Sequence, residues 1–307
     1  MLRYILQRII VFPLALLIAN FVGYAYAYYI SPIQLARNPY TFGNFSISPL
    51  FPQYFEYLKG VSQFDFGVLP QGGSILEIII RAGIASLWLL ALALLASIVL
   101  GLVLGFSAVR IAPPKVSSWL TGMITIGLAS PSYYIGIVLI ALSIVYVIWG
   151  PDATPLFPFQ GYGIDAHLVL PTLALMVLPT VKIAQITSTM LAGEMDKQYV
   201  VAARSFGHTM QAIRKRLAFR NVLAAVIITI VASLRLMIAE LIIVERLFDW
   251  PGIGRLFSST LVLTNRSDIF LFPPLLAALL TVLAAVFLLS DFVAGILVRY
   301  YDPRQAG

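Results

Sequence analysis

Four charged residues stand within long hydrophobic stretches, where a charge needs either a partner or a function. They are Lys182, Arg235, Glu240 and Asp291. A charge at the centre of a membrane span costs about 2.5–3.5 kcal/mol on insertion scales, so such residues usually face the interior of a helix bundle. We predict that Lys182, Arg235 and Glu240 line or gate a translocation path. Structural pairing between helices is the alternative, and Asp291, near the end of its stretch, fits either role.

The sequence lacks the residues that most covalent and metal chemistry requires. There is no cysteine, and the two histidines, His167 and His208, lie far apart. Disulfides, thiolate chemistry and cysteine-bound metals are excluded, and a histidine-based metal site is not expected. No Gly-x-x-x-x-Gly-Lys-Ser/Thr motif occurs, so the chain should not bind ATP in the usual way. We therefore expect no enzyme activity, no metal and no cofactor in this chain.

The composition is that of a membrane protein. Of the 307 residues, 60% are hydrophobic and 11% are charged, whereas soluble domains carry about 25% charged residues. A mean hydropathy of +0.94 leaves too little polar surface to cover a globule in water. The net charge is +7, and the basic residues lie mainly at the ends of the hydrophobic stretches. We therefore expect a bilayer around the chain and no nucleic acid partner.

The hydrophobic pattern predicts an all-α polytopic membrane protein with a single membrane domain and six spans. The first apolar run approaches the roughly 20 residues of a full span and exceeds the 7–15 residues of a signal peptide core, so we expect a retained helix. The predicted spans are residues 9–30, 83–109, 118–149, 168–191, 222–244 and 271–298. The predicted connections include an external segment at 31–82, a polar loop at 193–221 and an external loop at 245–270.

Prolines and glycines divide these elements further. Ser130 and Pro131 should break the third span, because proline removes a backbone hydrogen bond; the break is either part of a gate or a packing kink. Gly101 and Gly105 form a Gly-x-x-x-Gly pattern that favours close helix packing. We also expect a short helix at residues 52–60 of the external segment. Further residues predict a scoop-like external element or an interfacial loop: Glu245, Trp250, Pro251, Gly252 and Gly254.

The most informative polar stretch is Tyr199 to Asn221, which is strongly basic between two apolar runs. Its first part favours a short helix in which Ala202 and Ala203 offer small surfaces for another backbone to approach. Gly207 suits the helix end, where a positive φ is often needed. Lys and Arg are more frequent in alternate connections, which by the positive-inside rule places this stretch and both termini in the cytoplasm.

Several motifs together resemble the permease subunits of ABC importers, in the dipeptide, oligopeptide and nickel branch. The polar stretch matches the branch's Tyr-Val-x-Ala-Ala-Arg-x-x-Gly pattern, followed by Arg-x-Ala-x-Arg-Asn. Other matches are Phe64-Asp65-Phe66-Gly67 before the second span, Ala129-Ser130-Pro131-Ser132-Tyr133 at the predicted break, and Glu245-Arg246-Leu247-Phe248-Asp249-Trp250-Pro251-Gly252-Ile253-Gly254-Arg255-Leu256.

The resemblance implies a type I importer fold, and it implies that the polar stretch is a coupling loop whose short helix docks on an ATPase. The residues it assigns to coupling are Tyr199, Ala202, Ala203, Arg204, Gly207, Ile213 and Arg216. The implied partners are a second homologous permease, two cytoplasmic ATPases that bind ATP and Mg²⁺, and an extracytoplasmic binding protein. The implied location is the bacterial inner membrane, and the implied substrates are peptides or similar small solutes.

Departures from the branch pattern leave the substrate open. Ser31-Pro32-Ile33-Gln34 stands where a Pro-Gly-Asp-Pro element is usual, and Gln185 and Ser188 replace common basic residues. Nickel chelates, opines and oligosaccharides are therefore alternative substrates. An ion-coupled secondary transporter, with the intramembrane charges carrying protons, and a non-transporting scaffold are alternative functions.

Overall fold

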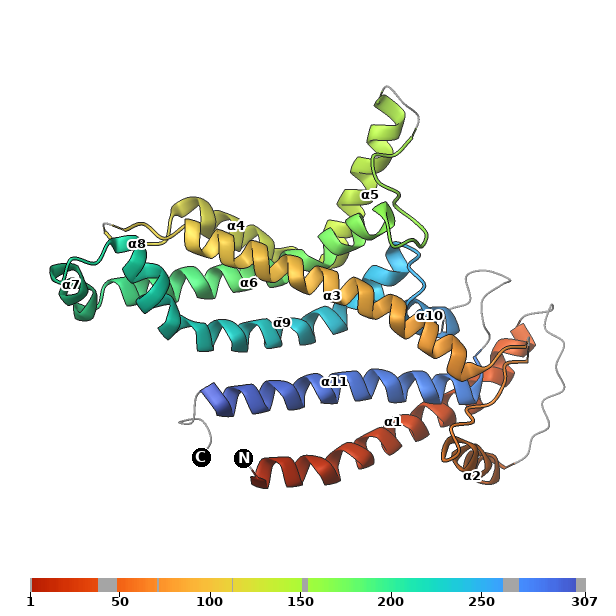
Figure 1. Cartoon of the computed structure of the whole chain (residues 1–307). Coiled ribbons are helices and arrows are strands. Elements are labelled where there is room, and N and C mark those ends of the chain that lie inside the picture. Colours follow the sequence, from red (N-terminus) through yellow and green to blue (C-terminus); the bar gives the residue numbers. More distant parts are fainter. Residues whose placement is uncertain are drawn as a thin grey trace. The chain divides into compact units, whose positions relative to one another are not determined.

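The computed structural model describes residues 2–37, 49–70, 72–111, 113–150, 154–261 and 271–301, and these are almost entirely helical. The helices are α1 (Leu2–Arg37), α2 (Leu50–Val61), α3 (Ile75–Ser107), α4 (Ser118–Ala129), α5 (Ser132–Trp149), α6 (Val169–Met195), α7 (Gln198–Ser205), α8 (Met210–Ala212), the π-helical segment η2 (Ile213–Ala218), α9 (Phe219–Leu247), α10 (Ile253–Leu261) and α11 (Pro273–Tyr301), with one 3₁₀ turn at Ala166–Leu168 (Figure 1).

Six helical segments among the described residues are long and apolar enough to cross a membrane, which confirms the predicted fold class. They are Ile5–Ile33, Ile75–Ser107, Ser132–Trp149, Ala166–Met195, Met210–Leu247 and Pro273–Tyr300. The chain divides into two compact units. The first is formed by Met1–Leu87 with Trp250–Leu289, and the second by Trp88–Asp249 with Ser290–Gly307.

Several helix boundaries differ from the predicted spans. Helix α1 continues to Arg37 and α3 begins at Ile75, so both extend into the segment expected between them. Near the start of α3, Arg81 donates a 2.8 Å hydrogen bond to Glu77 one turn earlier, so these charges are compatible with a helix. The predicted third span is two helices, separated at the expected break. The predicted short helix in the external segment is confirmed as α2. Parts of the two predicted external segments, residues 38–48 and 262–270, lie outside the described residues.

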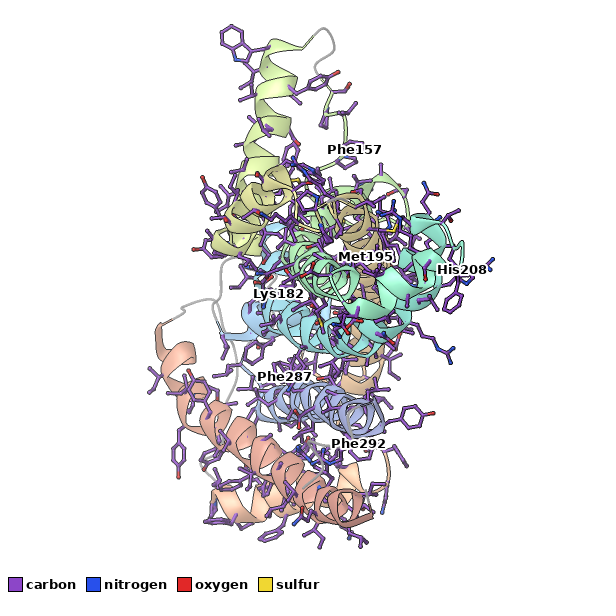
Figure 2. The ribbon with its side chains drawn as sticks, turned by 90° about the vertical axis from the view of Figure 1, so that its left-hand side faces the viewer. Phe157, Lys182, Met195, His208, Phe287 and Phe292 are labelled. Atoms are coloured by element: carbon purple, nitrogen blue, oxygen red, sulfur yellow. The ribbon has the colours of Figure 1, made fainter. Side chains whose placement is uncertain are left out.

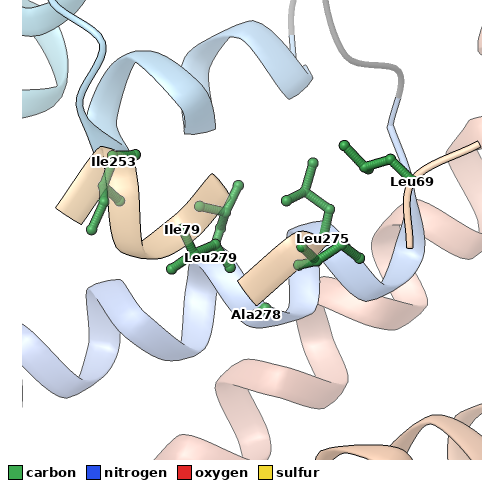
Figure 3. Packing of buried hydrophobic residues seen from close by; sticks show 8 residues of the cluster. Leu69, Ile79, Ile253, Leu275, Ala278 and Leu279 are labelled. Atoms are coloured by element: carbon green, nitrogen blue, oxygen red, sulfur yellow. The ribbon is translucent and has the colours of Figure 1, made fainter. Parts of the chain in front are cut away.

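The first unit has a hydrophobic core between α3, α10 and α11. Buried leucine, isoleucine and alanine side chains from these helices meet in it, together with Leu69 from the connection before α3 (Figure 3). The helical residues are Ile75, Ile79, Ala82, Ile253, Leu275, Ala278 and Leu279. Two hydrogen bonds fix α10 against α3. The Trp250 indole donates to the carbonyl of Ala85 at 3.0 Å, and the backbone N–H of Ile253 donates to the Ser86 hydroxyl at 2.8 Å.

The second unit is built around α6, which packs against α4, α5 and α9. The Gly-x-x-x-Gly pattern of α3 has the packing role predicted for it. A Cβ at Gly101 would lie 2.7 Å from the Ile183 Cβ, and one at Gly105 would lie 2.7 Å from the Thr187 Cβ. Only glycine therefore lets α3 approach α6 this closely.

A larger side chain at Gly101 should separate these helices. We expect Gly101→Leu to destabilise the fold by about 2–3 kcal/mol or more, because overpacking a tight core contact forces backbone shifts. Thermal unfolding of the purified chain in detergent measures the effect. Gly122→Leu is the matched control, because nothing lies within 4 Å of a Cβ there. Equal unfolding temperatures for the two variants would contradict the close contact.

Candidate functional site

The polar stretch begins with the predicted short helix, α7, which ends in a Schellman motif. The backbone N–H of His208 donates to the carbonyl of Ala203 at 3.2 Å, and that of Gly207 donates to the carbonyl of Arg204 at 3.0 Å. Gly207 has φ +84°, as its sequence position predicts. The Thr209 hydroxyl then accepts a 3.3 Å bond from the N–H of Ala212 and caps the next helical segment, which runs without interruption into α9.

A carboxylate at the end of α6 holds this stretch in place. The Tyr199 hydroxyl donates to Glu194 Oε2 at 2.8 Å, and the Asn221 amide donates to the same oxygen at 3.1 Å. Lys197 pairs with the other oxygen, Oε1. The Glu194 side chain is only 11% exposed. We call Glu194 with these three partners the Glu194 hub, and it joins the end of α6 to α7 and the start of α9.

Tyr199 serves the hub as a neutral donor. Burial, followed by its hydrogen bond to the Glu194 carboxylate, raises the pKa of Tyr199 to about 12. The phenol therefore keeps its proton throughout the physiological range and continues to donate to the carboxylate. Glu194 is not among the residues predicted from the sequence. Its signal is an acidic residue at the end of a span, followed three positions later by a lysine.

Part of the predicted coupling set faces the protein's own interior. Ala203 and Ile213 are buried in a cluster with Leu191, Met195 and Val200. Figure 2 shows Met195 among the helices and His208 at the outer edge of this unit. The expectation that Ala203 offers a free surface is therefore wrong. With 3.6 residues per turn, positions 200 and 203 share the face of α7 that packs on α6.

The remaining predicted coupling residues are exposed: Ala202, Arg204, Gly207 and Arg216. Two large apolar residues that the sequence analysis passed over are exposed beside them, Val201 at 71% and Phe206 at 83%. We call Val201, Ala202, Ser205 and Phe206 the α7 outer face. Val201 lies on α7 and Phe206 directly follows it, so this short segment presents two large exposed apolar side chains that a protein contact could cover.

The predicted path residues come from three elements that meet at the broken span. Ser130 and Pro131 have extended backbone conformations between α4 and α5, and Ser132 is buried just after them. The Ser132 hydroxyl and the positive charge of Lys182 on α6 both lie near enough to the Glu240 carboxylate on α9 to interact with it electrostatically. Among the described residues, Glu240 Oε2 is buried without a hydrogen-bond partner.

Arg235 does not belong to this group. It forms an ion pair with Asp291, with 2.7 Å between Arg235 Nη1 and Asp291 Oδ1, and the side chains are 38% and 33% exposed. The pair joins α9 to the C-terminal part of α11. Of the two roles considered for Asp291, the geometry shows helix pairing.

Reversing one charge of this pair should weaken the contact, and reversing both should restore it. We expect Arg235→Asp to cost roughly 1–2 kcal/mol of stability, less than the 3–5 kcal/mol of fully buried pairs because each side chain is about a third exposed. The double variant Arg235→Asp with Asp291→Arg should recover at least half of the loss. Thermal unfolding in lipid nanodiscs measures both. Additive losses in the double variant would contradict a direct pair.

The predicted external element is more deeply buried than expected. Glu245, Trp250, Gly252 and Gly254 are all buried, and Pro251 is half-buried. Trp250 has no exposed surface, and its indole N–H is bonded inside the first unit. Trp250 and the neighbouring Phe248 are therefore core residues and do not lie at a membrane interface. Phe248 is buried in the second unit and Trp250 in the first.

Comparisons with known proteins agree with these features. The family model described as binding-protein-dependent transport system inner membrane component matches residues 97–307. Similar proteins include the oligopeptide transport system permease protein AppB of Bacillus subtilis, 25% identical over 82% of this chain and 80% of that protein. The di/tripeptide transport system permease protein DppB of Pseudomonas aeruginosa is 28% identical over 83% of this chain and 81% of its own length.

A solved structure shares the fold. A chain of the MetNI methionine ABC transporter, solved in inward facing conformations, aligns with a TM-score of 0.52 at 18% identity, covering 74% of this chain and 97% of that chain. The family match extends over the α7 outer face, the Glu194 hub and the broken span. The chain therefore belongs to the family of inner membrane components of binding-protein-dependent transport systems.

Proposed function

We propose that the chain is a membrane subunit of an ATP-driven importer and forms half of the translocation path for peptides. A binding protein would deliver the peptide outside the cell, and a second homologous permease would complete the path. Two cytoplasmic ATPases would bind ATP and Mg²⁺ and hydrolyse ATP, since this chain has no P-loop motif. The location would be the bacterial inner membrane, with both termini in the cytoplasm.

The observation that carries this proposal is the α7 outer face on its rigid base. It combines an exposed Phe206 with an exposed small residue, Ala202. Below it, the Glu194 hub ties α7 to two long helices. A force applied to α7 therefore has a direct route into α6 and α9. The names of the similar proteins support peptides as the substrates.

The basic residues that follow α7 support its placement on the cytoplasmic side of the membrane. Arg214, Lys215, Arg216 and Arg220 follow it directly. Basic residues next to spans favour the cytoplasm.

In the proposed mechanism, closure of the ATPase dimer on ATP moves α7, and the Glu194 hub passes the movement to α6 and α9. These helices carry Lys182 and Glu240, whose charges interact near the broken span. A change in the positions of these two residues alters the path at that point. The helix bundle therefore opens alternately to the outside and to the cytoplasm. Hydrolysis resets the bundle. The chain's contribution is mechanical and electrostatic.

Reconstitution tests the proposal. The chain is purified in complex with the proposed second permease and the two ATPases, and the complex is placed in proteoliposomes together with the binding protein. Uptake of a radiolabelled tripeptide mixture is then measured. We expect uptake to require the binding protein and ATP on the cytoplasmic side. Uptake by this chain alone, driven by a proton gradient, would contradict the proposal and favour an ion-coupled transporter through Lys182 and Glu240.

A further inference from the structure

The first unit contains a cavity of about 650 Å³ that the coupling and path residues do not use. It lies between the C-terminal end of α1, helix α2, the turn after α2 and the start of α11. Tyrosine rings and two carboxylates dominate its lining: Tyr24, Tyr28, Tyr29, Tyr57, Glu56 and Asp65. Pockets of roughly 300–1,000 Å³ are typical of small-ligand sites.

The wall of the cavity is fixed by a polar network behind it. The buried Asn20 amide donates to the Thr281 hydroxyl at 2.9 Å and to the Tyr57 hydroxyl at 3.3 Å. The Tyr54 hydroxyl donates to Asn20 Oδ1 at 3.2 Å. Tyr24 stacks on Tyr57, with 5.2 Å between ring centroids. These contacts join α1, α2 and α11, so the cavity is formed by well-packed helices.

The charges among the described residues of the lining are of one sign. Glu56 and Asp65 contribute carboxylates, and none of the described side chains that line the cavity is a lysine or arginine, although the whole chain has a net charge of +7. The Gly67 N–H donates to Asp65 Oδ1 at 2.9 Å, which orients this carboxylate at the turn. Burial raises the pKa of Tyr57 to about 12, so that ring stays neutral.

This combination of aromatic faces and carboxylates matches one ligand chemistry. An ammonium or guanidinium group is attracted both to the face of an aromatic ring and to a carboxylate. Proline and phenylalanine side chains in the same lining, including Pro32, Pro273 and Phe272, offer apolar contact to the rest of the ligand. An anionic ligand would find no basic side chain among the described residues of this lining.

We propose that the cavity binds small peptides through a cationic group, either the N-terminal ammonium or a lysine or arginine side chain. The inference rests on the proposed function for its choice of peptides as the source of that group. It assigns Glu56, Asp65 and Tyr29 as specificity-determining residues for cationic over anionic peptides, at a site separate from the Lys182–Glu240 group.

Binding is tested on the full chain in phosphatidylcholine nanodiscs, without any partner. The ligand is fluorescently labelled Ala-Lys-Ala, compared with labelled, N-acetylated Ala-Glu-Ala. We expect saturable binding of the cationic peptide only. In the double variant Glu56→Gln with Asp65→Asn, the dissociation constant should rise about fivefold or more, as expected for two solvent-accessible ion pairs. Glu77→Gln, an exposed carboxylate of the same unit outside the cavity, should leave binding unchanged.

A second pair of variants separates the rings from the charges. Tyr29 is 65% exposed and lines the cavity, so Tyr29→Leu should weaken binding by about threefold through loss of the aromatic face. Tyr29→Phe should keep most of the affinity. Circular dichroism and thermal unfolding confirm that each variant is folded.

Three outcomes would overturn the inference. They are equal affinity for both peptides, no effect of the double variant, and loss of peptide binding in phosphatidylethanolamine nanodiscs, which would assign the cavity to a lipid headgroup. The assay contains no ATPase, so it is independent of transport. Saturable binding without ATP-driven uptake would refute the proposed transport function and support the binding site. ATP-driven uptake without peptide binding to this chain would support the transport function and refute the site.

Discussion

Replacing Phe206 with aspartate is expected to abolish ATP-driven uptake and leave the membrane fold intact. The ring is 83% exposed at the end of α7 and packs on little of its own chain. Truncating a central aromatic of an interface typically costs about 2 kcal/mol or more, which weakens association roughly 30-fold. A charge in an apolar contact adds a desolvation cost. The measurements are peptide uptake in proteoliposomes and recovery of the ATPase with the purified complex.

Phe64→Asp is the matched control for this experiment. Phe64 is also a strongly exposed phenylalanine, at 80%, but it lies in the turn after α2, far along the chain from α7. Its φ of +61° is one that aspartate tolerates better than most residues. Normal uptake is expected from this variant. Full activity of the Phe206 variant would exclude the α7 outer face as the main contact.

Removing the Glu194 carboxylate is expected to uncouple the importer without displacing the ATPase. In Glu194→Ala, Tyr199, Asn221 and Lys197 lose a shared charged acceptor, which should cost about 1–2 kcal/mol. The cost stays moderate because Lys197 and Asn221 are exposed and water can replace the lost bonds. Helix α7 would then move independently of α6 and α9. The ATPase should still co-purify and hydrolyse ATP, and uptake should fall at least tenfold.

Limited proteolysis reports the same change locally. Trypsin should cleave after Lys197 and Arg204 faster in Glu194→Ala than in the parent protein, because a loosened helix exposes its backbone more often. Glu194→Gln, which keeps one acceptor oxygen, should be intermediate. Glu77→Ala is the control, since its ion pair with Arg81 is exposed and carries little stability. Parallel loss of uptake and of the ATPase from the complex would contradict a transmitting role for the hub.

Local features of this protein could be predicted well from its residues. Spans follow from hydrophobicity, the helix end at Gly207 follows from glycine's tolerance of positive φ, and the break at Pro131 follows from a missing N–H. Close packing of α3 against another helix follows from Gly101 and Gly105, whereas α6 as the partner does not. Each of these depends on a few neighbouring residues.

Features that depend on three-dimensional packing could not be predicted. The pattern at Ala202 and Ala203 does not reveal which alanine faces inward, because that depends on where α6 lies. Tryptophan in an external loop favours a position at the membrane interface. The burial of Trp250 depends on the position of α3, which the local sequence does not give. The partner of Arg235, Asp291, is distant in sequence, and nothing local links the two. The coupling role of residues 199–221 stays a prediction of the family resemblance.

The absence of cysteine from the chain allows a direct test of the central claim, that α7 is the contact through which an ATPase drives this permease. A single cysteine is introduced as Ala202→Cys, at an exposed position where the change in size is small. The active complex is treated with a short maleimide–succinimidyl ester cross-linker in the presence and absence of ATP. The account predicts a cross-link to the ATPase from this position whose yield changes with ATP, and none from Phe64→Cys. An active complex in which Ala202→Cys gives no ATPase adduct, or in which Phe64→Cys gives an equal one, would contradict it.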